Sequence, residues 1–226
     1  MSGPRRLAVL AVVLLSCVGL ASIASGQSNS AQQAQIDNLF WIVTAMAVAI
    51  GLAVAFAIVW TVIKWRVRPG HTEPVQNLRT DHHGLEVAWT IVPAVILLTI
   101  GVLAFQTLNF TDTIPLSHVD VVITVTGHQW YWVINETWTA NNTTIHGLNN
   151  RLILFANQTA EFHILGADVA HSFFIPGLSF HIDAIPGHDN KGWLKPTMPG
   201  TYGFVCTQFC GVNHYTMVGT ATVLAA

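Results

Sequence analysis

The chain has 226 residues, of which 52% are hydrophobic and 9% are charged, and its formal net charge is −2. About a quarter of the residues of an ordinary soluble domain are charged, so the composition excludes a simple soluble protein. No run of basic residues occurs, which argues against nucleic acid as a partner. The three cysteines are an odd number with one close pair, unlike the pattern of a disulfide-rich protein.

The N-terminal stretch "RRLAVLAVVLLSCVGLASIASGQ" has the order of a secretory signal. Two arginines precede an apolar run from Leu7 to Leu20, and small residues follow. This order predicts a cleaved signal peptide over residues 1–26. A short additional membrane helix is the alternative interpretation.

Two further segments predict a transmembrane helical hairpin over residues 35–110. No charged residue occurs from Leu39 to Ile63, or from Val87 to about Leu108. A helix needs about 20 apolar residues to cross a bilayer, so helices are expected at about 39–63 and 87–108. Pro93 would lie near the start of the second helix, where proline is tolerated best.

Basic residues predict the orientation of this hairpin. The connection between the spans carries Lys64, Arg66, Arg68 and Arg79, together with the acidic residues Glu73, Asp81 and Glu86. After the second span no lysine or arginine occurs until Arg151. Because basic residues mark the cytoplasmic side, we expect the connection inside and both ends of the hairpin outside.

Residues 115–226 have the pattern of an all-β domain. The stretch "HVDVVITVTG" alternates and places Val119, Val121, Ile123 and Val125 on one face. The stretches "WYWVI", "RLILF", "AEFHIL", "TYGFV" and "MVGTATVL" are short, rich in β-branched and aromatic residues, and separated by Gly, Pro and Asn. Several short strands at such spacing predict a sandwich or barrel. About 110 residues are enough for one such core.

The stretch "CTQFCGVNHYTM", from Cys206 to Met217, concentrates soft metal ligands. Thiolate and thioether sulfur favour copper, zinc or iron–sulfur chemistry. Blue-copper sites combine one cysteine, two histidines and a weak axial methionine. The second histidine is expected from "DVAHSFFIPG", at His171, where an uncommitted imidazole in an apolar strand would be costly to bury. These ligands fit a cupredoxin-like layout.

A second cysteine in the stretch points to two metal ions. The thiolates of Cys206 and Cys210 can bridge two coppers, each of which also binds one imidazole. The remaining predicted ligands are His171, His214, Met217 and the backbone carbonyl of Gln208. Two alternatives stay open: a disulfide between the cysteines, and a Cys2His2 zinc site that leaves the methionine without a role. The other histidines of the outer domain are expected to be mostly structural.

Five motifs together resemble one family. They are "LEVAWTIVP" (85–93), "GHQWYW" (127–132), "HSFFIPG" (171–177), "IDAIPG" (182–187) and "CTQFCGVNHYTM" (206–217). In this order, on a hairpin followed by a β-domain, they resemble subunit II of the haem–copper cytochrome c oxidases. The resemblance covers residues from about 35 to 224. It implies a dinuclear CuA centre in a cupredoxin-like domain.

The resemblance also implies a role and partners. Such a subunit lies in the plasma membrane of a bacterium or archaeon, with its C-terminal domain on the periplasmic or outer side. It takes electrons from cytochrome c or a small copper protein and passes them to haem in subunit I. There oxygen is reduced to water and protons are pumped. No haem site or open metal position is recognisable in this chain itself.

Two further residues receive roles only from the resemblance. Trp130 occupies the position where electrons from the donor arrive, although a large aromatic residue can equally be part of a core. Glu86 occupies the position of a carboxylate near the mouth of a proton path into subunit I. Its alternative role is an acidic residue in the first turn of a helix, where the helix dipole favours it.

The sequence departs from the family at three positions. Gln208 replaces a glutamate whose side chain reaches a magnesium ion shared with subunit I, so magnesium would meet a neutral oxygen instead of a carboxylate. His181 and His188 stand where lysine or arginine is common. The link to the haem propionates of subunit I is therefore expected to differ in detail.

Acidic residues are few in the outer domain, although the family docks cytochrome c through carboxylates. Two hypotheses follow: sequence drift, or a domain that works in an acidic medium or meets a weakly charged donor.

Three rival functions also remain. They are a copper-free quinol oxidase subunit II, a membrane-anchored copper-binding or delivery protein, and nitrous oxide reductase, which is larger and has no such hairpin.

Overall fold

The computed structural model describes residues 28–66, 70, 81–139 and 143–225. The predicted signal peptide at 1–26 and the charged residues Arg68, Glu73 and Arg79 lie outside the described residues. The chain divides into two compact units. One contains residues 39–105, and the other contains residues 27–38 and 106–226.

Two long apolar helices account for the first unit. Helix α2 covers Ala31–Lys64 and helix α3 covers His83–Asp112, with mean hydropathies of 2.7 and 2.4 in their most apolar windows. Both are long and apolar enough to cross a membrane, which agrees with the predicted hairpin. Both extend past the predicted 39–63 and 87–108.

The polar flanks explain this extra helical length. Residues 31–38 are mainly alanine and glutamine, which are good helix formers. The Ser30 hydroxyl accepts the N–H of Gln33 at 3.1 Å and caps the first turn of α2. Because α3 already begins at His83, Pro93 lies inside the helix and not near its start. Membrane helices tolerate such prolines because neighbouring groups satisfy the freed carbonyl.

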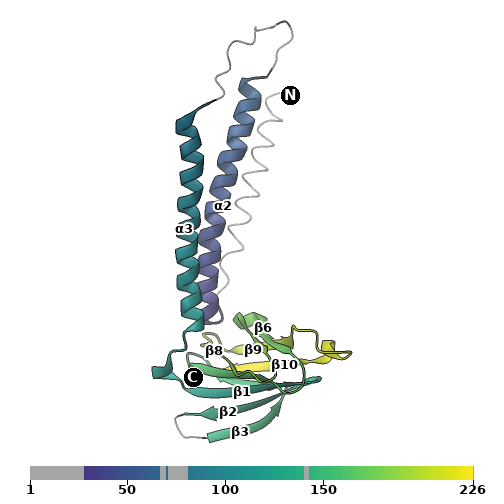
Figure 1. Cartoon of the computed structure of the whole chain (residues 1–226). Helices are drawn as coiled ribbons and strands as arrows, with labels where there is room; N and C mark the ends of the chain where they lie inside the picture. The colour runs from purple at the N-terminus through teal and green to yellow at the C-terminus, as the bar shows by residue number, and fades with distance from the viewer. Residues whose placement is uncertain (1–27, 67–69, 71–80, 140–142, 226) are drawn as a thin grey trace. The chain divides into compact units, whose positions relative to one another are not determined.

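The second unit is a β-sandwich of two five-stranded sheets, as predicted. The first sheet has the order β3-β2-β1-β5-β8. Its first two strands in the sequence, β1 and β2, form an antiparallel hairpin. Its strands are β1 (Val121–His128), β2 (Tyr131–Trp138), β3 (Thr143–Asn149), β5 (Ala160–Gly166) and β8 (Asn190–Leu194). Figure 1 shows β1, β2 and β3 together in one layer.

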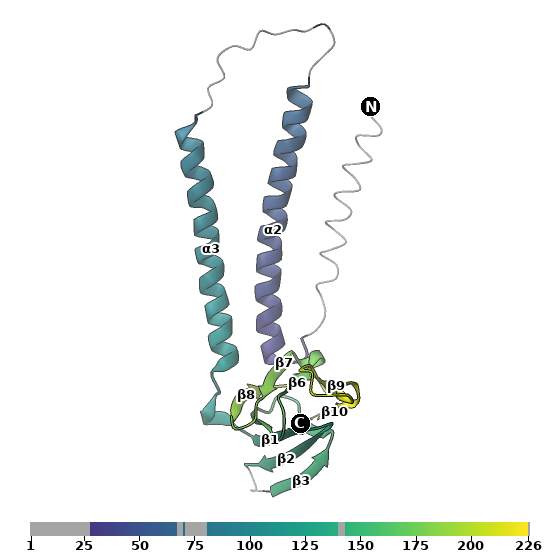
Figure 2. The same cartoon turned by 45° about the vertical axis from the view of Figure 1, so that its right-hand side comes forward.

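The second sheet has the order β4-β10-β9-β6-β7. Its strands are β4 (Arg151–Phe155), β10 (Val218–Leu224), β9 (Gly200–Cys206), β6 (His171–Ile175) and β7 (Phe180–Ala184). Figure 2 shows β6, β7, β9 and β10 on the opposite side of the domain from β2 and β3. Short 3-10 turns cover Leu116–His118 (η2), Pro176–Leu178 (η3) and His214–Thr216 (η4).

Strict alternation places the core between the sheets. In β1 the residues Val121, Ile123 and Val125 are buried and their neighbours are half-buried. The predicted fourth member, Val119, precedes the strand, since β1 begins at Val121. Strand β1 pairs antiparallel with β2 and parallel with β5, so it lies in the middle of its sheet. Burial on one face therefore fixes its register.

Aromatic side chains fill the middle of this core. Trp132, Phe162, Phe173 and Phe204 are fully buried. The rings of Phe173 and Phe204 lie 4.8 Å apart, and the Trp132 ring meets Phe173 edge-on at 5.1 Å. These contacts join β2 to β6 and β9, the two strands that lead to the predicted metal ligands. The ligands therefore start from a rigid scaffold.

The first residues of α2 belong to the β-domain unit. The Ser30 hydroxyl donates to the carbonyl of Leu178 at 2.6 Å, and the Gln32 side-chain amide donates to the carbonyl of Trp193 at 2.9 Å. Both side chains are buried. We call residues 29–32 the N-terminal clasp. It ties the chain just before the first span to strand β8 and to the turn η3.

Candidate metal centre

Most predicted ligands lie on one loop, which we call the ligand loop (residues 206–217). It leaves β9 at Cys206 and enters β10 after Met217. The N–H of Cys206 donates to the carbonyl of Met217 at 3.0 Å, so the two ends of the loop are held together. The turn η4 brings His214 back toward the cysteines, and the Met217 N–H donates to the His214 carbonyl at 3.2 Å.

The side chains of the loop converge on the two sulfur atoms. The Sγ atoms of Cys206 and Cys210 lie 4.0 Å apart, and both thiols are free. Nδ1 of His214 lies 3.4 Å from Cys210 Sγ, and Sδ of Met217 lies 3.8 Å from the same sulfur. The carbonyl oxygen of Gln208 lies 3.2 Å from Cys206 Sγ.

His171 completes this group from a neighbouring strand. It is the first residue of β6, whose Phe173 pairs with Cys206 of β9. Nδ1 of His171 lies 3.9 Å from Cys206 Sγ. His171, Cys206 and Cys210 are all buried, and their ligand atoms lie within 4.8 Å of one another. The structure thus brings the six predicted ligands together from β6 and one loop.

The donor set fits metal ions. Two ligands on one tetrahedral metal, at bond lengths of about 2.0–2.3 Å, lie about 3.5–3.8 Å apart. The separations around Cys206 and Cys210 fall near this range, whereas a disulfide requires about 2.05 Å between the sulfurs. Met217 is 1% exposed, so its thioether is held inside this group and away from solvent. Soft, buried sulfur with imidazole nitrogen suits copper.

The two imidazoles lie next to different sulfur atoms. Nδ1 of His171 is beside Cys206, and Nδ1 of His214 is beside Cys210. His214 is not in the compact group formed by His171 and the two cysteines. In a Cys2His2 zinc site all four ligand atoms surround one ion and lie about equally far from one another. The arrangement therefore differs from that of a single Cys2His2 zinc site.

Asp168 fixes the orientation of His171. Its Oδ1 lies 2.8 Å from Nε2 of His171, and its Oδ2 accepts the N–H of Gln129 at 2.7 Å. A carboxylate only accepts, so Nε2 carries the hydrogen and Nδ1 is free to face Cys206. Burial opposes ionisation of Asp168, but the hydrogen bonds from His171, Gln129 and Val169 outweigh it and lower its pKa to about 2.

The surroundings of Cys210 favour its thiol over its thiolate. Burial, followed by the neighbouring Cys206, raises the pKa of Cys210 to about 11. Metal ions bind the thiolate, so binding must release this proton.

Two glycines make room for aromatic rings beside the ligands. A Cβ at Gly127 would lie 2.9 Å from the His171 ring and 3.0 Å from the Trp132 ring. The Trp132 ring meets the His171 ring edge-on at 5.8 Å. A Cβ at Gly211, whose φ is +121°, would lie 3.2 Å from Nε1 of Trp130.

Trp130 therefore packs against the ligand loop. It is partly buried against the core and lies in the turn between β1 and β2. In the same turn the Gln129 amide donates to the carbonyl of Cys210 at 2.7 Å. The turn and the loop are thus in contact at Cys210 and Gly211.

Other predicted residues lie outside this group. Glu86 is in the first turn of α3 and belongs to the other unit, 3.9 Å from Nδ1 of His83. The Gln208 side chain is exposed. Nε2 of His181 lies 2.9 Å from the hydroxyls of both Ser172 and Thr207, which follow two of the ligands. His188 is exposed.

Sequence reasoning missed Asp168, Gln129, Gly127 and Gly211. An acidic residue three positions before a ligating histidine is the one available signal for Asp168. The two glycines lie inside the motifs at 127–132 and 206–217 but have no signal of their own. Among the histidines expected to be structural, His163 contacts Asp189 at 2.8 Å and Glu161 at 3.3 Å, and His128 stacks on Tyr131.

Comparison with known proteins gives the same family as the motifs. The family model "Cytochrome C oxidase subunit II, periplasmic domain" matches residues 121–223, and the model of the transmembrane domain of the same subunit matches residues 19–107. The probable cytochrome c oxidase subunit 2 of Rickettsia bellii is 32% identical over 194 residues, which cover 79% of this chain and 69% of the relative. The chain belongs to the cytochrome c oxidase subunit II family.

Other members of the family differ in length. The cytochrome c oxidase subunit 2 of Alkalihalophilus pseudofirmus is 30% identical over 220 residues, which are 93% of this chain and 61% of that protein. The crystal structure of the periplasmic domain of subunit II of cytochrome oxidase (CoxB) of Bradyrhizobium japonicum is 29% identical, with a TM-score of 0.41. That match covers 47% of this chain and 86% of the other.

Proposed function

We propose that this chain is the electron-accepting subunit of a terminal haem–copper oxidase. Two copper ions would be held by Cys206, Cys210, His171, His214, Met217 and the backbone carbonyl of Gln208. The observation that carries the proposal is the 4.0 Å sulfur pair with one imidazole nitrogen beside each sulfur. A copper pair with shared thiolates supplies a one-electron acceptor whose geometry changes little on reduction.

The chain's own residues would hold and orient this acceptor. Asp168 keeps the hydrogen of His171 on Nε2, so that Nδ1 is the ligand atom. Trp132 packs edge-on against the ring of His171 and is itself backed by Phe173, and the His171 side chain is fully buried from water. Trp130, in contact with the ligand loop at Gly211, would be the point at which electrons arrive from the donor.

The electrons would then pass to haem in subunit I, where oxygen is reduced to water and protons are pumped. Cytochrome c or a small copper protein would be the donor. Glu86 would lie near the mouth of a proton path, in keeping with its position in the first turn of α3. Magnesium shared with subunit I would have only the neutral, exposed side chain of Gln208 here, which weakens that site.

The topology supports a location in a bacterial or archaeal plasma membrane with the β-domain outside. The N-terminal clasp at the start of α2 and the residues after α3 both belong to the β-domain unit. Two spans that start and end at one domain place their connection on the other side of the membrane. That connection contains Lys64, Arg66 and further basic residues, which mark the cytoplasmic side.

Replacement of Cys210 by serine tests the proposal. Serine keeps the size of the side chain but removes the second bridging thiolate. We expect the copper content of the full-length chain to fall from two ions to one or none, and oxygen uptake by the assembled oxidase to be lost. Thr201→Ser is the control, since Thr201 is exposed near the start of β9, at the opposite end of the strand from the ligand loop. Unchanged copper content in Cys210→Ser would refute the proposal.

A further inference from the structure

The ligand loop presents three large apolar side chains to solvent. Phe209 is 75% exposed, Val212 is 83% exposed and Tyr215 is 78% exposed. All three lie between ligands in the sequence of the loop, and the ring of Phe209 lies 5.9 Å from that of His214. Apolar side chains that gather on one exposed loop mark a contact site for another molecule.

The turn that carries Trp130 contacts this loop and adds another exposed aromatic side chain. Gln129 and Trp130 contact the loop at Cys210 and Gly211, and Tyr131 follows them with 41% of its surface exposed. Tyr131 stacks in parallel on His128 at 4.9 Å, which holds its ring in place. We call Phe209, Val212, Tyr215 and Tyr131 the apolar face.

Charged groups are nearly absent from this part of the domain. No Asp, Glu, Lys or Arg occurs in residues 127–135 or 205–226. The carboxylate of Asp168 lies next to this surface, where it accepts hydrogen bonds from His171 and from the N–H of Gln129.

Other carboxylates of the described β-domain also have partners. Asp120 accepts the Thr159 N–H, Asp183 accepts the Ser172 hydroxyl, and Asp189 contacts Lys191. These carboxylates keep their charge, but none of them belongs to residues 127–135 or 205–226, so the apolar face itself contributes no charge that could steer a donor.

We propose that the apolar face docks an electron-donor protein with an uncharged, apolar surface around its own redox group, as a small copper protein presents. This inference rests on the proposed function and names the class of donor. A basic donor would gain little here, because charge complementarity raises the association rate only where opposite charges face each other. An apolar partner buries the exposed tyrosines and Val212, and tyrosine is enriched at the centres of interfaces.

Salt dependence of electron transfer tests the proposal. Stopped-flow reduction of the copper-loaded full-length chain in detergent is measured with reduced azurin and with a basic cytochrome c. Between about 10 mM and about 500 mM salt the screening length falls from about 30 Å to a few Å. We expect both second-order rate constants to change by less than about twofold. A fall of about tenfold or more with the basic cytochrome c would overturn the proposal.

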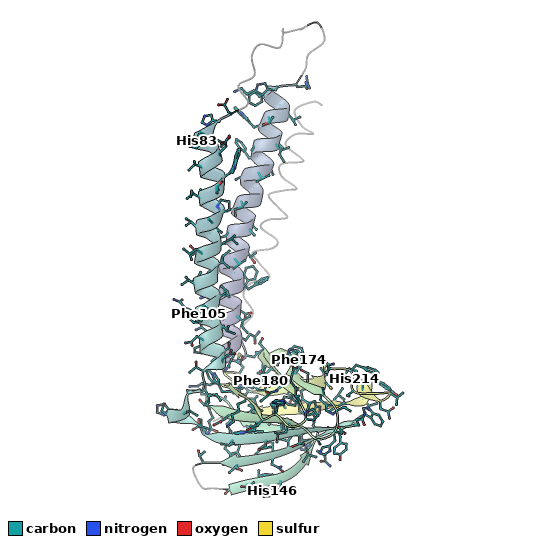
Figure 3. The ribbon with its side chains drawn as sticks, viewed as in Figure 1. His83, Phe105, His146, Phe174, Phe180 and His214 are labelled. Carbon is teal, nitrogen blue, oxygen red and sulfur yellow. The ribbon has the colours of Figure 1, made fainter. Side chains whose placement is uncertain are left out.

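Substitutions identify the surface. Val212→Asp and Tyr131→Ser are each expected to lower the rate constant with azurin about tenfold, as loss of an interface anchor does. Ile145→Ser is the control, because Ile145 is comparably exposed to Tyr131 but lies on β3 beside His146, away from His214 (Figure 3). Unchanged rates in both variants of the apolar face would overturn the proposal.

The copper content and optical spectrum of every variant are measured before the kinetics. A wild-type chain without the copper pair would refute the proposed function and not the docking face. Tyr131 lies outside the ligand loop, so Tyr131→Ser decides the matter if Val212→Asp disturbs the loop.

Discussion

Asp168 and His171 form a hydrogen-bonded pair, with Oδ1 2.8 Å from Nε2, and this pair sets which nitrogen of His171 faces the sulfur atoms. The side chain of His171 is fully buried, whereas that of Asp168 is 34% exposed. The carboxylate thus reaches from the surface to a buried ligand. The same carboxylate also holds the turn before Trp130, through the N–H of Gln129.

Asp168→Asn is expected to weaken copper binding by about 10- to 100-fold, because loss of a carboxylate behind a ligating histidine has that effect. Asparagine can accept from Nε2 but lacks the charge, and its amide nitrogen cannot accept from Gln129. Chelator competition measures the affinity. Asp189→Asn is the matched control, since Asp189 also contacts a histidine but lies away from the ligands. Equal affinities in the two variants would contradict this role.

Glu136→Gln is expected to flatten the pH dependence of stability. Glu136 is fully buried, and its Oε1 accepts the N–H of Ile153 at 2.7 Å. Burial, only partly offset by that hydrogen bond, raises the pKa of Glu136 above its usual 4.5. The folded chain then binds more protons than the unfolded chain from pH 4.5 up to the raised pKa, so this residue's contribution to stability falls as pH rises through that window.

Chemical unfolding followed by circular dichroism at several pH values checks this sign. We expect the variant and the wild type to agree below the window. Within the window the free energy of unfolding of the variant should exceed that of the wild type, and the difference should grow by about 1.4 kcal/mol for each pH unit. Glu161→Gln is the control, because Glu161 lies half-buried beside His163. A wild type that gains stability relative to Glu136→Gln as pH rises would refute the argument.

Gly211→Ala is expected to displace Trp130. Its φ of +121° disfavours any side chain, and the new Cβ would lie 3.0 Å from the Gln129 amide and 3.2 Å from the Trp130 ring. We expect the free energy of unfolding to fall by about 1–2 kcal/mol and tryptophan fluorescence to change. Gly203→Ala, where a Cβ meets nothing within 4 Å, should do neither. Identical fluorescence in all three proteins would show that the contact is unimportant.

The N-terminal clasp is expected to stabilise the β-domain. Ser30→Ala leaves the Leu178 carbonyl without its 2.6 Å hydrogen bond, and Gln32→Ala leaves the Trp193 carbonyl without its donor. Each loss should lower the free energy of unfolding by about 1–3 kcal/mol, since the groups are buried. Gln35→Ala, one turn further along α2 and exposed, is the control. A soluble fragment of residues 115–226 lacks the clasp. It should therefore have a lower free energy of unfolding than the same fragment with residues 28–33 joined to its N-terminus through a flexible linker.

The sequence predicted those parts of the protein in which the residue type is itself the signal. Uncharged runs predicted the two helices, and alternation predicted β1. Short stretches rich in β-branched and aromatic residues predicted β2, β4, β5, β9 and β10. Cys206, Cys210, His214 and Met217 were recognisable because soft ligands at this spacing have few other uses. His171 required the additional argument that an apolar strand does not hold an idle imidazole.

The remaining features depend on contacts between distant segments. β3 is rich in threonine and polar residues, and β7 and β8 mix polar with apolar residues, so none of them has a clear period. The start of α2 depends on Ser30 and on the contacts of Gln32 with β8, which lies far along the chain. Asp168, Gly127 and Gly211 act on residues that folding brings beside them.

The central claim is that two copper ions share the thiolates of Cys206 and Cys210. Electron paramagnetic resonance of the oxidised, copper-loaded full-length chain, with its copper content determined in parallel, tests it most directly. One electron shared equally by two copper nuclei gives seven hyperfine lines, and one copper nucleus gives four. The account predicts two coppers per chain and the seven-line spectrum. One copper with a four-line spectrum, or a single zinc ion in its place, would contradict it.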